Sequence, residues 1–228
     1  MANDSTWNAP PLSQNHDSQA NAAVELKTDL PDSLSINTTM MPRITNVMDF
    51  QLNEVLTRLF RIDVIGKLVR RWSQVCPISP VPWSLLEEIL LSVESVASHL
   101  SQNPAEAHNV ATGIKDATRQ PLVVPPSTLP TEFSKLLTGK NLRLESIGII
   151  LSIASNAALG LLESDVVFSS LALNMQDRQS FVEDMLSASD TCIAFCEQYF
   201  GVHDAIVWLR YENFLLTLNS CGYASKYK

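Results

Sequence analysis

Apolar residues recur at helical spacing along most of this chain, and a mostly polar pattern is confined to its beginning. Between residues 46 and 72 they return every three or four positions, which is typical of an amphipathic helix. The same spacing indicates helices over residues 84–100, 131–138, 142–162, 166–173, 177–199 and 204–218. No stretch sustains period-two alternation, so the pattern predicts an all-α protein of about seven to eight helices.

Polar and proline-rich segments set the predicted boundaries. Residues 1–44 are rich in Ser, Asn, Gln, Asp and Pro, a composition that predicts a disordered leader ahead of one helical domain over residues 45–228. Three prolines in Cys76–Pro82 exclude a helix there, and five prolines indicate a linker over residues 101–130 with a short helical turn at most. We predict that residues 46–72 form one long helix or two with a bend near Gly66.

The most apolar stretch is Ser146–Leu162, which is nearly free of charge. It nevertheless contains three serines and an asparagine, whereas a bilayer span needs about 20 predominantly apolar residues. We therefore predict a helix buried among other helices and no membrane association.

Charge and cysteine content narrow the function classes. The net charge of −8 gives a field that repels phosphate backbones, so direct DNA binding is disfavoured. The four cysteines follow no disulfide-framework spacing, and the first thirty residues lack a basic start followed by an apolar run. These features predict an intracellular, cytoplasmic protein with reduced thiols.

Residues 139–150 and the stretches that begin at Phe181 and Asp204 resemble the middle homology region of fungal zinc-cluster transcription factors. The first is GKNLRLESIGII over Gly139–Ile150, in which Leu144 stands where that family often has Trp. The second begins with FVEDMLSASDTCIAFC at Phe181 and continues into DAIVWLRYENFLL from Asp204. The resemblance implies a helical regulatory domain that, in complete regulators, follows a DNA reader holding two zinc ions with six cysteines.

The chain has four cysteines and none near its N-terminus, so we expect no such reader here. In length the chain is also similar to fungal stand-alone hetero-Diels–Alder cyclases of tropolone–sesquiterpenoid pathways. This similarity implies a cofactor-independent cyclase of fungal secondary metabolism, in which an apolar cavity orients diene and dienophile. The alternative is a reader-less relative of the transcription factors that acts as a regulatory or ligand-sensing protein, with a nuclear location.

The sequence around residues 203–213 mixes aromatic and titratable side chains along one predicted helix. We expect acid or base chemistry from His203, Glu212 and Tyr211. We expect an apolar small-molecule ligand or substrate to contact Trp208, Trp72 and Trp83. The alternative is a purely structural role, in which the aromatic residues belong to the core and Glu212 pairs with a basic residue on another helix. No cofactor motif is present, and an exposed apolar helix face would allow a homodimer.

Two further groups have both a functional and a structural interpretation. Cys192 and Cys196 share a helix face and could hold a metal ion, but we expect small core residues and no metal. Five cations could grip a phosphate or an acidic partner, although a solvated helix face is the favoured interpretation. They are Arg58, Arg61, Lys67, Arg70 and Arg71.

Overall fold

The computed structural model describes residues 41–76, 78–199 and 202–226, and it describes the side chains of these residues except at 41–48, 130, 131 and 222–226. All that follows concerns the compact unit Thr39–Lys228. The predicted leader lies outside the described residues apart from its last four, which open the first helix.

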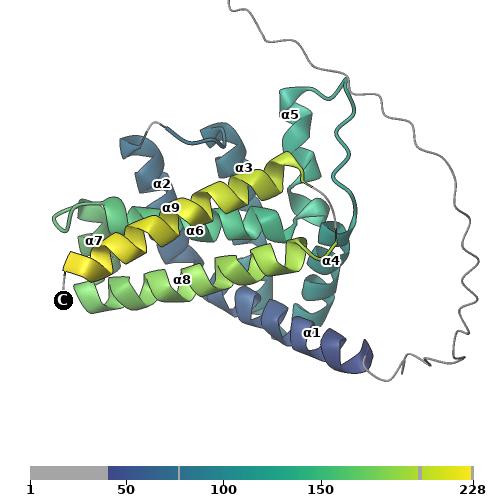
Figure 1. Cartoon of the computed structure of the whole chain (residues 1–228), viewed down its shortest axis with the longest axis horizontal. Coiled ribbons are helices and arrows are strands. Elements are labelled where there is room, and N and C mark those ends of the chain that lie inside the picture. Colours follow the sequence, from purple (N-terminus) through teal and green to yellow (C-terminus); the bar gives the residue numbers. More distant parts are fainter. Residues whose placement is uncertain (1–40, 77, 200–201, 227–228) are drawn as a thin grey trace, which may run out of the picture. The chain divides into compact units, whose positions relative to one another are not determined.

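Seven helices of 13 residues or more make up the described part of the chain, and no strand occurs in it (Figure 1). The long helices are α1 (Met41–Arg58), α2 (Ile62–Val75), α3 (Trp83–Gln102), α4 (Ala107–Arg119), α6 (Leu144–Gly160), α8 (Met175–Cys196) and α9 (Asp204–Lys226). Two short helices, α5 (Pro130–Phe133) and α7 (Val166–Leu171), and the 3₁₀ turns η2 (Leu59–Arg61), η3 (Pro104–Glu106), η4 (Ser134–Leu136) and η5 (Gly139–Asn141) complete the set. The all-α prediction is confirmed.

Helix α6 is the centre of the fold. Every residue from Leu144 to Ala158 is buried, because α8 and α9 run alongside it and α2, α3 and α4 pack on it (Figure 1). Gly148 allows α6 and α9 to approach each other closely, since a Cβ there would lie 2.7 Å from a methyl carbon of Leu209 on α9. The expected buried core helix is therefore confirmed, and none of the described helices combines the length and the apolarity that crossing a membrane requires.

Two predictions about the first half of the chain were wrong. The break after α1 is the 3₁₀ turn η2 and not a bend at Gly66, which lies inside α2 where a Cβ would come within 2.6 Å of Glu94 Oε1 on α3. Gly66 thus allows a close contact between helices. The predicted linker contains the 13-residue helix α4, because Ala111, Ile114 and Thr118 supply an inward-facing stripe.

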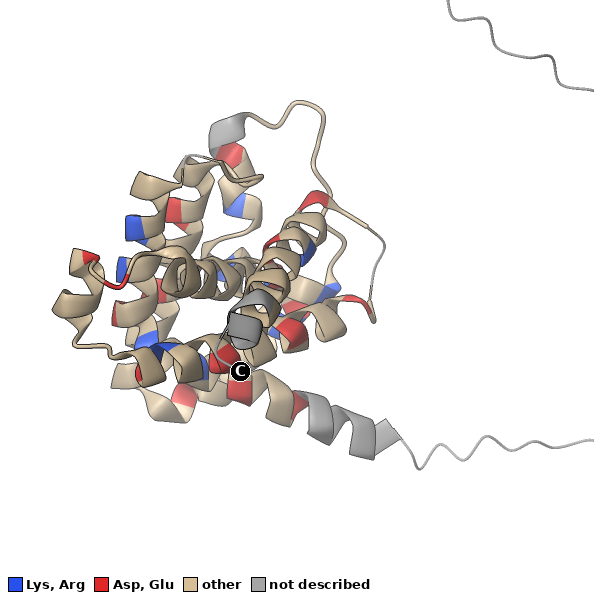
Figure 2. Cartoon of the chain, turned by 60° about the vertical axis from the view of Figure 1, so that its left-hand side comes forward, with Lys and Arg blue, Asp and Glu red and all other residues tan. Residues whose placement is uncertain are grey.

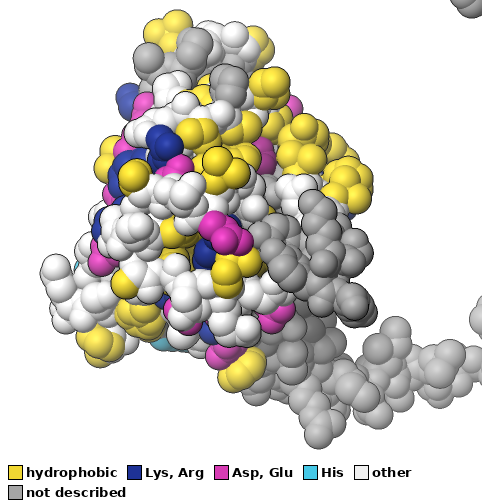
Figure 3. Space-filling model, turned by 90° about the vertical axis from the view of Figure 1, so that its left-hand side faces the viewer, with side chains coloured by type: hydrophobic (Ala, Val, Ile, Leu, Met, Phe, Trp, Pro, Cys, Tyr) yellow, Lys and Arg dark blue, Asp and Glu magenta, His cyan; other side chains and the backbone are white. Residues whose placement is uncertain are grey.

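Charges are distributed over many helices and do not form one basic surface among the described residues (Figure 2). On the face that looks onto the end of α9, cationic and acidic side chains lie next to each other, and hydrophobic side chains reach the surface in separate places (Figure 3). Opposite charges therefore neutralise one another locally on this face.

Candidate functional site

A pocket of about 330 Å³ lies between the start of α3, the α5–η4 segment and α9. We call it the Trp208 pocket. Its wall consists of Pro82, Ser84, Leu85, Glu88, Phe133, Ser134 and Trp208. The rings of Phe133 and Trp208 meet edge to face with their centroids 6.0 Å apart. This volume is at the lower end of the range for small-molecule sites, and the wall is mostly apolar.

The polar groups of the Trp208 pocket are few. The hydroxyl oxygen of Ser134 is buried and has no hydrogen-bond partner among the described residues. Glu88 and Ser84 are exposed at the pocket. A buried polar atom without a partner is costly, so a ligand group that bonded to the Ser134 hydroxyl, once the side chain had turned it toward the pocket, would gain affinity.

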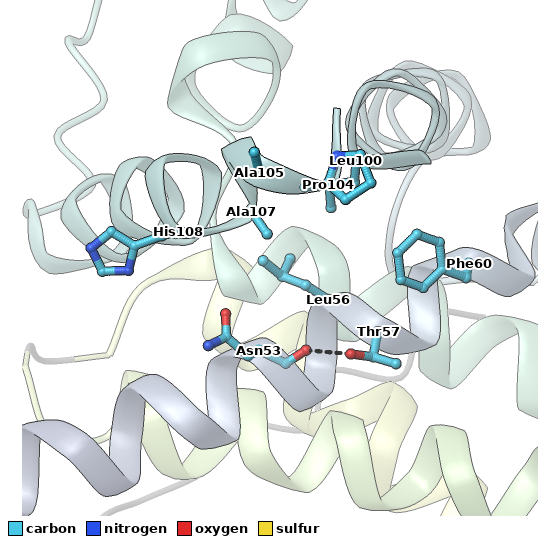
Figure 4. Close-up of a pocket in the computed structure, with 9 residues that line it drawn as sticks. All are labelled: Asn53, Leu56, Thr57, Phe60, Leu100, Pro104, Ala105, Ala107 and His108. Carbon is cyan, nitrogen blue, oxygen red and sulfur yellow. Dashed lines mark hydrogen bonds between the residues drawn. The ribbon is translucent and has the colours of Figure 1, made fainter. Parts of the chain in front are cut away.

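A second pocket of about 380 Å³ lies between α1, the end of α3, η3 and the start of α4 (Figure 4). Leu56, Leu100 and Ala107 form much of its wall, and the exposed ring of Phe60 stands at one end. Asn53 and His108 lie together at the opposite end (Figure 4), and both are exposed. In contrast to the Trp208 pocket, no buried polar atom among its described wall residues lacks a partner.

His203, an expected acid–base residue, contacts a buried ion pair at the start of α6. Its Nε2 lies 3.2 Å from Oε1 of Glu145, and the guanidinium of Arg143 donates to the same oxygen over 3.0 Å. Arg143 also donates to the carbonyl oxygens of Ala117, Thr118 and Gln120 at 2.6, 2.9 and 2.9 Å. Because these carbonyls end α4, the ion pair ties together the ends of α4, α6 and α9.

The charge state of Glu145 follows from these contacts. Burial opposes ionisation of its carboxyl, but the hydrogen bond from His203 and the charge of Arg143 outweigh burial and lower the pKa. Burial of the thiols of Cys192 and Cys196 raises their pKa values well above the usual range, and the neighbouring Glu145 carboxylate adds to both shifts. Both thiols are buried, as expected for core cysteines, and no metal-ligand cluster occurs among the described residues.

Glu212, the second expected acid–base residue, is buried on the inner side of α9. The amide of Asn156 on α6 donates to the Glu212 carbonyl oxygen over 3.1 Å and reaches its carboxyl at 3.5 Å. The hydroxyl of Ser79, in the proline-rich loop, also lies 3.5 Å from this carboxyl. No cation among the described side chains contacts the group, so burial raises the pKa of Glu212 to about 7, which the Ser79 and Asn156 hydrogen bonds only partly offset.

The remaining predicted residues are scattered. Tyr211 is 44% exposed on the outer side of α9. The ring of Trp72 packs against Gly160, where a Cβ would lie 2.7 Å from it. Trp83 is partly buried against the core, and its indole nitrogen has no hydrogen-bond partner in the described part of the chain. Of the six predicted site residues, only Trp208 lines the candidate pocket.

The arginines of the predicted cationic face are engaged in ion pairs with other helices and loops. Arg70 bonds to Glu94 and Glu87 of α3 at 2.8 and 3.0 Å, and Arg71 bonds to Asp165 before α7 at 2.8 Å. Arg58 and Arg61 both lie within 3.7 Å of Asp184 on α8. These contacts leave little uncompensated charge for an anionic partner.

Sequence reasoning missed Arg143, Glu145 and Ser134. A pair of opposite charges two residues apart at the start of an otherwise apolar helix could have marked the first two, because burial of one charge calls for the other. Nothing in the sequence could have identified Ser134, because what distinguishes its hydroxyl is that it is buried without a hydrogen-bond partner among the described residues.

Comparison of the chain with protein-family models, curated proteins and solved structures finds no match in any of the three.

Proposed function

We propose that this chain binds an apolar small molecule in the Trp208 pocket. The observation that carries the proposal is the hydroxyl of Ser134, which has no partner among the described residues, in a mostly apolar wall. Aromatic rings supply contact area, and one hydroxyl fixes the orientation of a carbonyl or hydroxyl on the guest. The guest is therefore a mainly apolar molecule with at least one hydrogen-bonding group.

The leading activity is the predicted cofactor-independent cyclisation of hetero-Diels–Alder type. In such a cycloaddition the three π bonds of the diene and dienophile are replaced by two new σ bonds and one new π bond without redox change, so no cofactor is required. The pocket wall would hold both partners close together, and the Ser134 hydroxyl would donate to the carbonyl oxygen of the heterodiene and polarise it. His203 and Glu212 have no part in this scheme, because each is bonded inside the fold away from the pocket wall.

The alternative is a ligand-sensing regulatory protein. One observation favours it: the two strongest acid–base candidates, His203 and Glu212, serve as interior contacts and not as pocket groups. A sensor needs only the bound guest and a helix that responds to it. Helix α9 qualifies, because it carries Trp208 in the pocket and the Glu212 contact on its inner side.

Binding is tested with the neutral fluorescent probe N-phenyl-1-naphthylamine, whose emission rises in apolar surroundings. We expect saturable binding that weakens about tenfold or more in Trp208→Ala, because one aromatic wall is lost. The matched control is Phe60→Ala, which removes the aromatic wall of the other pocket and should leave the affinity unchanged. The reverse pattern would place the probe in the α1–α3–α4 pocket and overturn the proposal.

Catalysis and sensing are separated by deleting the gene in its host and measuring metabolites and transcripts together. Cyclisation predicts that one late intermediate accumulates while the transcripts of its pathway persist. Sensing predicts that a whole set of transcripts is lost and that no single intermediate builds up.

A further inference from the structure

Helix α9 is apolar on two opposite sides. Its inner side packs on α6 and α8 through Ala205, Leu209 and Leu216, which are fully buried. Its outer side carries four large apolar residues that are each about half exposed. They are Val207 (48%), Tyr211 (44%), Phe214 (58%) and Leu218 (53%). A helix that is hydrophobic on both sides is suited to burial on both sides, and the described residues bury only one.

The outer residues are spaced like the seam of a coiled coil. The steps from 207 to 211, 214 and 218 are four, three and four residues, and the next step of three reaches the exposed Cys221. At 100° per residue these five positions fall within a sector of about 80°. We call this row the α9 seam. A stripe this narrow is typical of one helix pairing with another.

The absence of charged side chains from the α9 seam favours a second copy of this chain as its partner. The chain carries a net charge of −8, so two copies repel each other over most orientations. Between Ala205 and Cys221 the one acidic residue is Glu212, which is buried, and the one basic residue is Arg210, which pairs with Glu197. Asp204, just before this stretch, is exposed, so two copies avoid bringing α9 carboxylates face to face when their pairing is confined to the row from Val207 to Cys221. This row offers a strongly charged partner no free countercharge.

The exposed area indicates the strength of the contact. The four large side chains together expose roughly 400 Å² per copy, which is within the range of patches that often have a function. Pairing two seams would bury roughly 800 Å², less than the ~1,200 Å² of stable interfaces. A two-fold pair uses the same surface on both copies and closes on itself, so it stops at the dimer.

We propose that the α9 seam is a self-association surface through which two copies of this chain form a weak, reversible dimer. Because Trp208 flanks the seam on the same helix, the interface would lie next to the Trp208 pocket. The proposal does not depend on the pocket being occupied, so it can fail while the proposed function holds.

The test is sedimentation velocity of the full chain over a wide range of concentrations, with a reducing agent present so that Cys221 forms no disulfide. We expect the average mass to rise toward that of a dimer, and the dimer dissociation constant to rise at least tenfold in the double variant Phe214→Glu and Leu218→Glu. The matched control is Leu91→Glu on α3, since Leu91 is 52% exposed and Leu218 is 53% exposed. Circular dichroism verifies that each variant keeps its helical content.

Two results would overturn the proposal. One is a monomer at every concentration, which would leave the seam to an amphipathic helix of a different protein. The other is a dimer that the seam variant leaves intact or that Leu91→Glu disrupts equally, since either outcome places the contact elsewhere.

Discussion

Glu145 on α6 and Glu212 on α9 are both buried carboxyl groups, yet their pKa values are shifted in opposite directions. Both lie within the packed layer of α6 and α9. Glu145 accepts from Arg143 and His203, and its pKa is lowered, whereas the donors that Glu212 meets in the described part of the chain are neutral, and burial raises its pKa to about 7. Burial alone favours the protonated acid, and a neighbouring cation reverses that preference.

The contrast also separates two kinds of interior contact. The Glu145 cluster ties three helix ends through charge-assisted bonds, which are strong only while both charges are present. The Glu212 contacts are long hydrogen bonds to neutral groups, and they hold a carboxyl group that changes charge near neutral pH. The first cluster is a structural tie, and the second is sensitive to pH.

Removing the cation of the Glu145 cluster should have the largest effect. In Arg143→Met the carboxylate of Glu145 stays buried without its ion-pair partner, and the carbonyls that end α4 lose their donor. We expect a loss of about 3–5 kcal/mol in the free energy of unfolding, measured by chemical denaturation. The control is Arg210→Met, which breaks the exposed pair with Glu197 and should cost at most about 1 kcal/mol. Equal losses in the two variants would refute the structural tie.

Replacing the carboxyl of Glu212 by an amide should change how the free energy of unfolding depends on pH. Because the folded-state pKa of Glu212 is about 7 and its ordinary value is 4.5, its stabilising contribution is complete below the ordinary value. That contribution disappears as the pH rises through the folded-state value, with a total change of about 3 kcal/mol. Glu212→Gln should remove this decline, as seen in denaturation curves at a series of pH values. A decline that persists in Glu212→Gln but vanishes in the exposed control Glu197→Gln would contradict the assignment.

A smaller effect is expected from the histidine that completes the Glu145 cluster. His203→Ala removes one donor to the carboxylate but leaves Arg143 in place, so we expect a loss of about 1–2 kcal/mol. Thermal unfolding compared with that of the exposed control His99→Ala measures the difference. If catalysis and not packing were the role of His203, the stability of the two variants would be the same.

The smallest effect on stability is expected from Ser79→Ala, which tests the hydrogen bond to the Glu212 carboxyl. Ser79→Ala removes the 3.5 Å contact with Glu212 and the 3.2 Å hydrogen bond that the Val81 amide donates to the Ser79 hydroxyl, so we expect a loss of about 1 kcal/mol in stability. The hydroxyl of Ser79 lowers the pKa of Glu212, and its loss should therefore move the decline in stability to higher pH. Denaturation curves of the variant and the parent chain over the same pH series measure this displacement. A displacement to lower pH would show that Ser79 does not donate to the carboxyl.

The sequence determined the helical class and most helix positions, because amphipathic periodicity is a local property. It also predicted that Ser146–Leu162 is a buried helix, which holds for Ser146–Ala158, whereas Leu162 follows the helix and is exposed. It failed at α4, where prolines on both sides concealed a short inward stripe. The apolar spacing over residues 204–218 also did not distinguish the buried Leu209 from Val207, Tyr211 and Phe214, which face outward.

Only the tertiary structure decided which polar residues meet. Arg143 contacts carbonyls 23 to 26 residues earlier, and Asn156 reaches Glu212 56 residues later, distances over which periodicity carries no information. The charge states of Glu145 and Glu212 depended on whether a cation lay beside each carboxyl, and the pocket depended on how α3, η4 and α9 pack together. The pattern along a chain specifies which side of a helix is buried, whereas the partners on that side are set by the packing of helices that are distant in sequence.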